Sequence, residues 1–338
     1  MRYTDTWTAH PRIEQTRVST VEILRCPGVM MQADVSFMEK VMKRDTIAIR
    51  DPFVLAVPEE ETYYLYGTTD PDPWKQSGIG FDAYMSADLE DWRGPYPVFR
   101  PMTGFWGTHN FWAPEVYRYR NAFYMFASFK APRHERATQI LRADTPLGPF
   151  EVHSAGPVTP SGWECLDGTF FVEDGQPWLI FSHEWVQVND GEMWAVPLSP
   201  DLRRTEGAPS LLFRGSDGPW TKGLVRRDGS GLEDARVTDG PFVYQAGQGN
   251  LFLLWSSISP SGYALGVARS VSGRIRGPWK QEPEPLLEAG RGHGMIFRGF
   301  DGRAYITYHY PNDTPNERFQ FREIRLEGAR LALKGEER

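Results

Sequence analysis

The stretch RDPFVLAV, from Arg50 to Val57, places an Arg and an Asp directly before an apolar run that is typical of a buried β-strand. A carboxylate inside a core is costly unless it has a partner or a function. Four more segments join a polar start to a strand-like run, and we call all five the leader strands. The other four are WAPEVYRY at Trp112, LDGTFFVE at Leu166, TDGPFVYQ at Thr238 and GHGMIFRG at Gly292.

Each leader strand is followed, 8 to 14 residues later, by a strand rich in aromatic residues. These second strands are TYYLYGTT (62–69), AFYMFASF (122–129), PWLIFSHEW (177–185), LFLLWSSI (251–258) and RAYITYHY (303–310). After these strands, related turn segments that contain Gly-Pro and an aromatic residue begin at Ser86, Arg142 and Ala268. A weaker version begins at Ser199.

The leader strands begin 54 to 72 residues apart, and such a period with several strands in each repeat is typical of the blades of a β-propeller. A single blade cannot bury both of its faces, so neighbouring blades must pack on it. The count predicts an all-β, five-bladed β-propeller. A β-sandwich with irregular hairpins would explain the strands, but not the recurring order of leader, hairpin and turn segment.

Composition narrows the function. The 338 residues are 14% aromatic, and the 33 Gly and 27 Pro are spread along the chain, as expected for many short strands and tight turns. The formal net charge of −7 argues against nucleic acid or an anionic membrane surface as the main partner, because both attract a basic face. A neutral ligand is therefore favoured.

The N-terminal residues lack the apolar core of a secretory signal, and no stretch approaches the length of a membrane span, so we expect a soluble, cytoplasmic protein. Cys26 and Cys165 are expected to be buried structural thiols. We divide the chain into an N-terminal segment, 1–48, and a propeller domain, 49–338. The segment could close the propeller, pack on its side or mediate a homodimer, and the sequence does not choose among these.

In a propeller the innermost strands surround a central channel, so the residues that start them converge at one end of the axis. If the leader strands are innermost, Asp51, Glu115, Asp167, Asp239 and His293 meet in a small volume. Each one alone is better explained as a turn residue. Recurrence in every repeat favours a site, because such a cluster is costly without a function.

Several carboxylates beside aromatic residues are the groups that glycoside hydrolysis uses. One carboxyl protonates the leaving oxygen and another activates water or attacks the anomeric carbon. Aromatic rings supply flat faces for sugar rings. Those expected in or next to loops on the same side are Trp74, Phe105, Trp106, Phe111, Trp112, Trp163 and Trp185.

The order of these motifs resembles glycoside hydrolase family 43, the inverting five-bladed propeller enzymes that include β-xylosidases, α-L-arabinofuranosidases and arabinanases. RDPF resembles the motif of the general base, which implies that role for Asp51 and a substrate contact for Arg50. WAPEVY resembles the motif that lines the subsite of the cleaved sugar. This resemblance implies sugar contacts from Trp112 and its neighbours Phe111 and Glu115.

Two more segments carry the resemblance. LDGTFFVE resembles the segment whose Asp raises the pKa of the general acid and orients it, which points to Asp167. GRGHGMIFRG resembles the segment whose His lies on the axis and helps to hold a central cation or water. His293 is therefore the expected ligand of a calcium or sodium ion, and the chemistry itself requires no cofactor.

One position departs from the family. The general acid is normally a Glu before Gly-Pro, whereas this chain has Asp239 in VTDGPFVY. An Asp side chain reaches roughly 1.3 to 1.5 Å less far, and a displacement of about 1 Å can cost a hundredfold in rate. We place Asp239 first as the acid, and Glu184 of FSHEW second, with Trp185 beside it as a substrate contact. Glu233 in GLEDAR is a less favoured candidate.

The resulting prediction is an inverting, exo-acting glycoside hydrolase that releases a terminal pentose, α-L-arabinofuranose or β-D-xylose, from a small oligosaccharide. Two alternatives remain open at this point. One is a propeller glycosidase that acts on another sugar, such as galactofuranose or a fructoside. The other is a carbohydrate-binding relative that kept the pocket but lost the acid.

Overall fold

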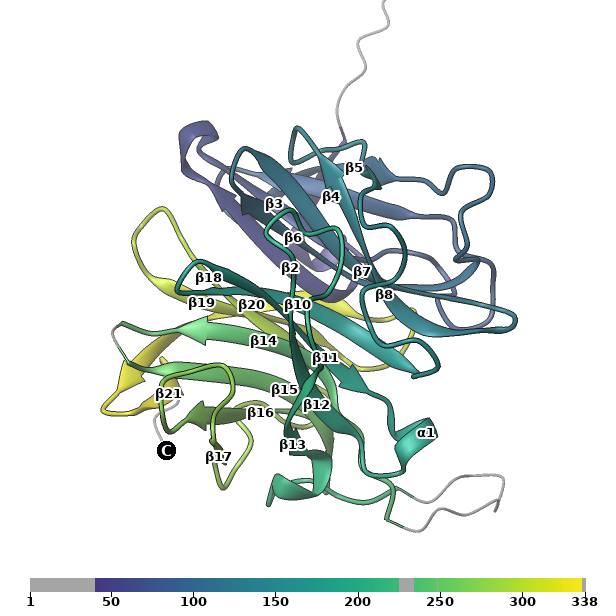
Figure 1. Cartoon of the computed structure of the whole chain (residues 1–338). Helices are drawn as coiled ribbons and strands as arrows, with labels where there is room; N and C mark the ends of the chain where they lie inside the picture. Colours follow the sequence, from purple (N-terminus) through teal and green to yellow (C-terminus); the bar gives the residue numbers. More distant parts are fainter. Residues whose placement is uncertain (1–39, 225–233, 248, 336–338) are drawn as a thin grey trace, which may run out of the picture. The chain divides into compact units, whose positions relative to one another are not determined.

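The structure is a computed structural model that describes residues 40–224, 234–247 and 249–335, which lie in one compact unit, Glu39–Arg338. Within these residues the regular structure is almost entirely β-strand (Figure 1). The helical elements are short: η1 (Arg44–Thr46), η2 (Pro58–Glu60), η3 (Gly215–Asp217) and α1 (Trp185–Val188). In the described part of the chain no helix has the length and apolar character needed to cross a membrane.

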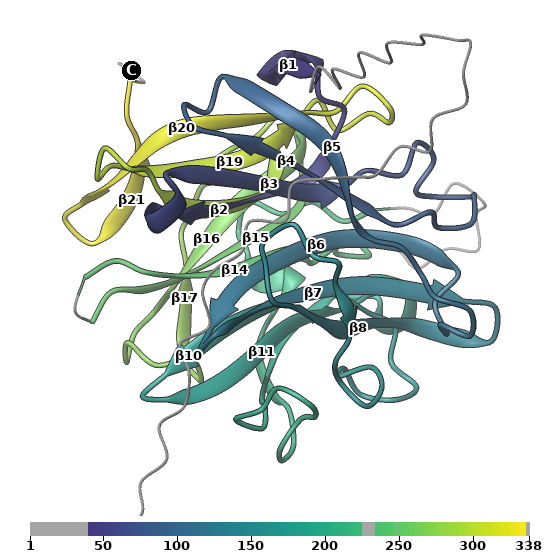
Figure 2. The same cartoon turned by 90° about the horizontal axis from the view of Figure 1, so that it is seen from above.

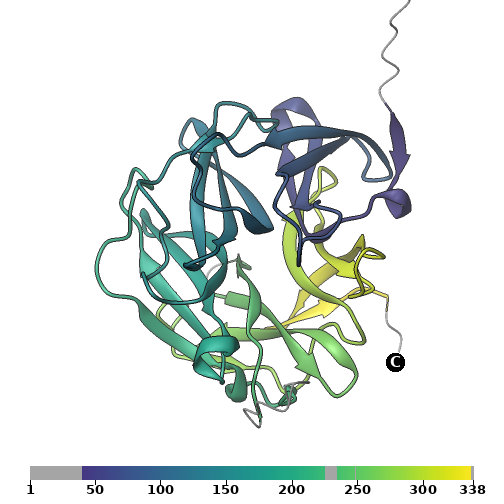
Figure 3. The same ribbon diagram turned by 90° about the vertical axis from the view of Figure 1, so that its right-hand side faces the viewer.

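The strands form five antiparallel sheets in a ring, which confirms the predicted five-bladed β-propeller (Figure 3). Blade one contains β2 (Arg50–Val57), β3 (Thr62–Thr68), β4 (Phe81–Ser86), β5 (Asp91–Phe99) and β1 (Val41–Lys43), from inside to outside. Blade two contains β6 (His109–Tyr119), β7 (Ala122–Ala131), β8 (His134–Ala143) and β9 (Glu151–Val152). Blade three contains β10 (Cys165–Glu173), β11 (Gln176–His183), β12 (Glu192–Pro197) and β13 (Ser210–Arg214).

Blade four contains β14 (Asp239–Gln245), β15 (Leu251–Ser259), β16 (Gly262–Ser270) and β17 (Trp279–Gln281). Blade five contains β18 (Gly292–Arg298), β19 (Ala304–Tyr310), β20 (Arg318–Glu327) and β21 (Arg330–Leu333). The predicted leader strands are the innermost strand of every blade. The aromatic runs are the second strands, which are buried on both sides by neighbouring strands and blades, and this explains their nearly continuous apolar character.

Residues 40–48 pack on blade one. Strand β1 pairs with the outer strand β5, with Val41 opposite Arg93. The side chains of Ile47 and Ile49 are buried in the core of blade one. Residues 40–48 therefore pack on the propeller, which is one of the arrangements that the sequence left open for the N-terminal segment. Residues 1–39 lie outside the described part of the chain, as do Cys26 and Glu233.

Each inner strand begins with a β-bulge. On β2 the pairing with β3 skips from Arg50 to Phe53, and similar skips occur in the other four inner strands. Every inner strand has such a skip containing one residue with a positive φ of 45° to 56°; these residues are Asp51, Ala113, Asp167, Gly240 and His293, and β6 has a second skip that contains Asn110 with a φ of 51°. A bulge bends the strand and re-aims a side chain, so the recurring position is aimed differently from the rest of the strand.

This geometry corrects one part of the sequence interpretation. The recurring position in blade four is Gly240, not Asp239, and in blade two it is Ala113, not Glu115. A Cβ atom on Gly240 would lie only 2.9 Å from Cγ of His293. Blade four therefore has no room for a side chain at the recurring position, and its carboxyl comes from the residue before.

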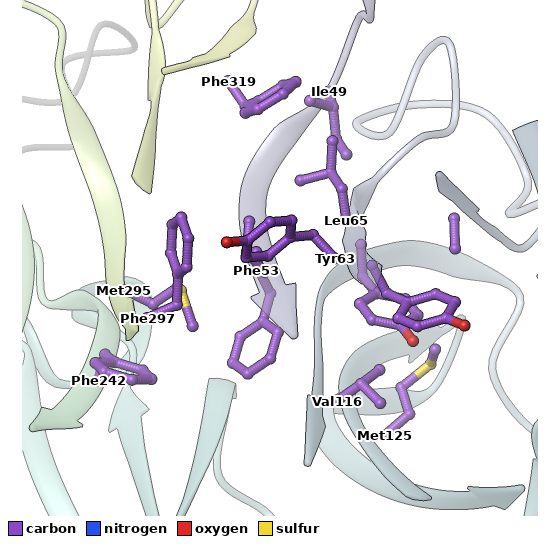
Figure 4. Packing of buried hydrophobic residues seen from close by; sticks show 14 of the residues in the cluster. Ile49, Phe53, Tyr63, Leu65, Val116, Met125, Phe242, Met295, Phe297 and Phe319 are labelled. Atoms are coloured by element: carbon purple, nitrogen blue, oxygen red, sulfur yellow. The ribbon is translucent and has the colours of Figure 1, made fainter. Parts of the chain in front are cut away.

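The core lies between the blades and follows the inner strands toward the other end of the axis. Phe53, Val116, Phe242, Met295 and Phe297 come from four different blades and pack in one hydrophobic cluster (Figure 4). Packing of this kind holds the blades at fixed angles, because aromatic and branched side chains interlock without voids. Cys165 is buried in the cluster between blades two and three, as expected for a structural thiol.

Among the described strands, the ring closes between blades one and five without exchange of a strand (Figure 2). Strand β2 packs on β18 and β19. At one end of this seam Tyr63 stacks on Phe300, with ring centroids 4.1 Å apart. At the other end Arg50 donates a hydrogen bond of 2.6 Å to Glu317. The seam therefore runs directly beside the bulge of Asp51.

Candidate active site

The starts of the inner strands open into a pocket of about 300 Å³. Its lining residues are Arg50, Asp51, Thr68, Pro73, Trp74, Trp112, Leu166, Asp167, Glu184, Trp185, Val186, Val237, Thr238, Asp239 and His293. Two larger hollows lie elsewhere. One of about 1080 Å³ lies between residues 282–291 and the strands β20 and β21, and one of about 930 Å³ lies at the opposite ends of the inner strands. Neither is lined by the buried acids of the leader strands.

Eight of the ten predicted site residues line this pocket, and two do not. Phe111 is fully buried, with ring contacts to Phe81, Phe99 and Phe129, so it supports the wall and cannot contact a sugar directly. Glu115 is 7% exposed and lies below the pocket, where its carboxylate accepts a hydrogen bond of 2.6 Å from Tyr117. The predicted substrate contacts of Phe111 and Glu115 are therefore corrected.

His293 is surrounded by the carboxyl groups of three blades. Its Nδ1 lies 3.1 Å from Oδ1 of Asp51, 3.4 Å from Oδ1 of Asp239 and 3.8 Å from Oδ2 of Asp167. Burial lowers the pKa of His293, but the three carboxylates outweigh burial and raise the pKa to about 10. The imidazole is therefore protonated at neutral pH and supplies a positive charge on the axis.

Asp51 is held in its ionised form. Burial would raise its pKa, but the positive charges of His293 and Arg50 lower the pKa to about 2. The Thr68 hydroxyl donates a hydrogen bond of 2.7 Å to Oδ2. The backbone N–H of Asp51 faces Nδ1 of His309 at 3.3 Å, and burial keeps that imidazole neutral by lowering its pKa to about 3. Asp51 can therefore accept a proton from a water molecule at any ordinary pH.

Asp167 has the opposite character. Burial raises its pKa, and although His293 opposes this change, the carboxylates of Asp239 and Asp51 add to it. The backbone N–H of Gly240 donates a hydrogen bond of 3.0 Å to Oδ2 of Asp167, which ties blade three to blade four. Asp167 is therefore a buried member of the carboxyl cluster that is tied to the neighbouring blade.

Glu184 ends the connection between β11 and α1 and enters the pocket from blade three. Its side chain is buried and forms an ion pair with Arg136 of β8. Burial raises the pKa of Glu184, and the carboxylates of Glu164 and Asp239 add to this, whereas Arg136 and Lys130 oppose it. The net direction is upward, which is the requirement for a group that must carry a proton before it acts as an acid.

Asp239 faces two donors. Its Oδ1 accepts a hydrogen bond of 2.7 Å from the hydroxyl of Tyr263 and lies 3.4 Å from Nδ1 of His293. Because Oδ1 of Asp51 is 3.1 Å from the same nitrogen, the sum of the two distances limits the separation of the closest Asp51 and Asp239 oxygens to 6.5 Å. Asp239 is therefore held close to Asp51, with its oxygen already engaged by Tyr263.

The expected axial cation has a partial set of ligands. Asp167, Asp239 and His293 each offer one ligand atom, and these atoms lie within 4.8 Å of one another. Calcium prefers about six to eight oxygen ligands at about 2.3 to 2.6 Å, which these side chains do not provide. The nitrogen of His293 also faces the carboxylate oxygens where an ion would have to lie. The described side chains alone therefore fit a calcium or sodium ion poorly, and we derive no step through one.

Two tryptophans form one wall of the pocket. The Trp112 ring lies below the guanidinium of Arg136, 4.1 Å from its centroid, and its indole N–H donates a hydrogen bond of 2.7 Å to the carbonyl of Pro73. Trp74, from the connection between β3 and β4, contacts Trp112 edge to face at 4.9 Å. Such walls suit the apolar faces of a sugar ring.

Sequence reasoning missed four residues around the site, namely Thr68, Arg136, Tyr263 and His309. All four lie on strands outside the leader strands, and no motif marks them. The one available signal was a His inside an otherwise apolar strand, in RAYITYHY. Arg136 could be recognised only once the fold had placed blade two beside blade three.

The fold and the site define a class: a β-propeller with an ionised carboxylate and protonatable carboxyls in one aromatic-walled pocket is equipped as a glycoside hydrolase. The sequence pattern of the family described as Glycosyl hydrolases family 43 matches residues 46–332. The chain belongs to this family, as its motifs indicated, and it is a glycoside hydrolase.

Similar proteins agree with this assignment. The chain is 23% identical over 297 residues to an extracellular exo-α-(1→5)-L-arabinofuranosidase, ArbA, of Cellvibrio japonicus, which covers 78% of this chain and 79% of the relative. The structure is similar to an endo-arabinase of Bacteroides thetaiotaomicron, with a TM-score of 0.78 and 38% identity over 85% of this chain and 98% of that one. A thermostable family-43 glycoside hydrolase gives a TM-score of 0.71 and 25% identity, over 85% and 93% of the two chains.

Proposed function

We propose that the protein is an inverting, exo-acting hydrolase that removes a terminal pentose from oligosaccharides. The observation that carries the proposal is the pairing, in one small pocket, of an ionised Asp51 with a Glu184 whose pKa is raised. A pocket of about 300 Å³ supports the binding of one terminal sugar between these groups rather than the passage of a long chain.

In the proposed mechanism the terminal sugar lies with its anomeric carbon between Asp51 and Glu184. Asp51 accepts a proton from a water molecule, and the water oxygen attacks the anomeric carbon from that side. Glu184 donates its proton to the glycosidic oxygen as the bond to the leaving group breaks. Attack and departure on opposite faces invert the anomeric configuration.

Glu184 replaces Asp239 as our first candidate for the acid. Inverting enzymes separate their two carboxyls by about 6.5 to 9.5 Å to admit a water molecule. The closest oxygens of Asp51 and Asp239 are at most 6.5 Å apart, by the sum of 3.1 and 3.4 Å, and that oxygen of Asp239 already accepts a hydrogen bond from Tyr263. Asp239 and Asp167 then keep Glu184 and the axis in the required charge state.

We place α-L-arabinofuranosides first among the substrates and β-D-xylosides second. The support for arabinose is that the two similar proteins are named as an exo-arabinofuranosidase and an endo-arabinase. Because one of these two similar proteins is an endo-arabinase, endo-action on arabinan is a competing proposal. Galactofuranosides and fructosides stay as outcomes of the substrate test, and so does binding without hydrolysis.

The test is a panel of 4-nitrophenyl pentosides and linear α-1,5-arabino-oligosaccharides, with the products separated by size and the first-formed anomer followed by NMR. We expect free arabinose as the first product, in the inverted configuration. The variant Asp51→Asn should lose a factor of about 10³ or more in kcat, because the base can no longer accept a proton. The thermal transition of this variant serves as the control for folding.

Other results would point elsewhere. First products of mixed length would favour endo-action. Binding of oligosaccharides in calorimetry without turnover on any pentoside would favour the carbohydrate-binding alternative. The cytoplasmic location, the homodimer and the axial cation stay predictions, and the name of the Cellvibrio relative describes an extracellular enzyme.

A further inference from the structure

Trp74 stands out at the mouth of the pocket. Its side chain is 47% exposed, which makes it the most exposed tryptophan among the described residues. Large apolar side chains that stay exposed in a fixed place commonly mark a binding surface. Trp74 lies in the connection between β3 and β4, next to Pro73, and both line the pocket with Asp51.

The indole ring of Trp74 is held from several sides. Its N–H donates a hydrogen bond of 3.0 Å to Oγ1 of Thr314 in blade five. The guanidinium of Arg50 lies 5.1 Å from the ring centroid, and Trp112 contacts the ring edge to face. The hydrogen-bonding group of the indole is satisfied inside the protein, so the part that remains exposed is apolar.

The anchor for this ring is itself fixed. The Thr314 hydroxyl donates a hydrogen bond of 2.6 Å to Glu317, and Arg50 donates to the same carboxylate oxygen. Glu317 is 2% exposed. A buried, fully paired ion pair thus orients Trp74 across the seam between blades one and five. An ordered platform of this kind binds a flat ligand without losing much side-chain entropy.

The position of the ring relative to the carboxyls defines what it can bind. Asp51 and Glu184 are 8% and 6% exposed and lie deep in the pocket, whereas Trp74 is half-exposed at its opening. A terminal sugar held between the two carboxyls fills the deep part. The rest of an oligosaccharide must then leave through the opening, past Trp74.

We propose that Trp74 is the platform of a second sugar subsite, which binds the residue on the leaving-group side by stacking on its apolar face. This inference rests on the proposed function and deepens it. The substrate is then an oligosaccharide that spans both subsites, rather than a single sugar carrying a small leaving group. Trp74 acts as a specificity-determining residue and takes no part in proton transfer.

The experiment compares two substrates of one sugar, an α-1,5-arabinotriose and the corresponding arabinosyl fluoride, which fills only the deep part of the pocket. In Trp74→Ala we expect kcat/KM for the trisaccharide to fall about tenfold or more, as the loss of one aromatic stacking contact predicts. The value for the fluoride should change by less than about twofold, since it makes no contact outside the deep subsite.

Two further variants sharpen the test. Thr314→Val removes the acceptor of the indole N–H and one donor to Glu317 but leaves the ring, so it should lower kcat/KM for the trisaccharide by a smaller factor than Trp74→Ala does. Phe300→Ala removes an aromatic ring that is 40% exposed at the opposite end of the axis. It should leave kcat/KM for both substrates unchanged.

The opposing results are distinct. Trp74→Ala could lower kcat/KM for both substrates by the same factor, or leave the value for the trisaccharide unchanged. Either result would show that the proposed second subsite is wrong and that the Trp74 ring only stabilises the contact between blades one and five. If the unaltered protein hydrolyses neither substrate, the proposed function fails first, and the assignment of a leaving-group subsite fails with it.

Discussion

Asp51 and Glu115 are buried to the same degree near the axis, with 8% and 7% of their surface exposed, yet their pKa values move in opposite directions. The pKa of Asp51 falls to about 2, whereas burial raises the pKa of Glu115 to about 7. His293 and Arg50 contact Asp51 directly. Glu115 has only hydroxyl donors in contact, from Tyr117 and Thr169, and a more distant influence of His293. Burial alone keeps a carboxyl protonated, and a cation in contact is needed to ionise it.

Glu184 lies between these two cases. It has one cation in contact, Arg136, and feels two neighbouring carboxylates, Glu164 and Asp239. Its pKa is raised, so Arg136, even with the more distant Lys130, does not outweigh burial and two like charges. The pocket therefore holds a base and an acid of the same chemical type, separated by the number of cations that each one contacts.

The largest expected effect separates Glu184 from Asp239 as the acid. Glu184→Gln should lower kcat about 10²- to 10⁴-fold for oligosaccharides, because their leaving oxygen must be protonated. It should change kcat much less for a 2,4-dinitrophenyl glycoside, whose leaving group needs no proton. The dependence of kcat on leaving-group pKa measures this difference.

Asp239→Asn is the matched control. It should lower kcat by one and the same factor for every leaving group, because Asp239 is not expected to protonate the leaving oxygen. A steep dependence on the leaving group in Asp239→Asn, together with a flat one in Glu184→Gln, would restore Asp239 as the acid.

The second prediction concerns stability at Glu115. A group whose folded pKa is about 7, against an ordinary 4.5, binds more protons in the folded than in the unfolded state between these values. The free energy of unfolding should therefore fall by up to about 3 kcal/mol as the pH rises through this range. Glu115→Gln should remove this fall.

Urea unfolding at pH 5 and at pH 8 measures the Glu115 effect, with Glu61→Gln on the surface as the control. An equal loss of stability in the unaltered protein and in Glu115→Gln would show that Glu115 is ionised in the fold.

Asp51 should behave in the opposite sense. Its folded pKa of about 2 lies below the ordinary 3.8, so the unfolded state binds more protons between these values. The stabilisation, of about 2 kcal/mol, is present above pH 4 and is lost as the pH falls toward 2. Urea unfolding in steps from pH 5 to the lowest pH at which the protein folds should show this loss, and Asp51→Asn should lack it.

The smallest expected effect is a shift in a pH profile. Arg136 favours the ionised form of Glu184, so Arg136→Gln should raise the pKa of Glu184 further. The basic limb of kcat/KM should then move upward by about one pH unit, while the acidic limb, set by Asp51, stays in place. A loss of activity without any movement of the basic limb would mean that Arg136 only supports Trp112.

The fold was predictable because the leader strands and the aromatic strands recur at a blade-sized period and with the same order of turns. The register at the strand starts was not. Asp239 and Glu115 look equivalent to Asp51 in the sequence, but a bulge displaces each strand start, and the ring of His293 leaves room only for Gly240 in blade four. Steric contact between blades decides this, and a single repeat does not encode it.

The electrostatics of the site were also hidden. The predicted acids Asp51, Asp167, Asp239 and Glu184 do line one pocket. Their charge states, however, depend on partners far away in the sequence, such as Arg136 for Glu184. These pairs form only when blades meet, so the order of acid and base strength could not be derived from motifs.

The ring that closes without exchanging a strand has a further consequence. Every blade is a contiguous stretch of chain, and the seam between blades one and five is held by side-chain packing and a few local contacts, such as the backbone hydrogen bond of 3.2 Å from Ile49 to Glu317. The seam between blades one and five is therefore only one of the places between blades at which the ring could be opened. Joining the seam by a linker and opening the chain between two other blades would leave every sheet whole, so that the order of blades along a gene can change while the arrangement of the pocket residues is kept.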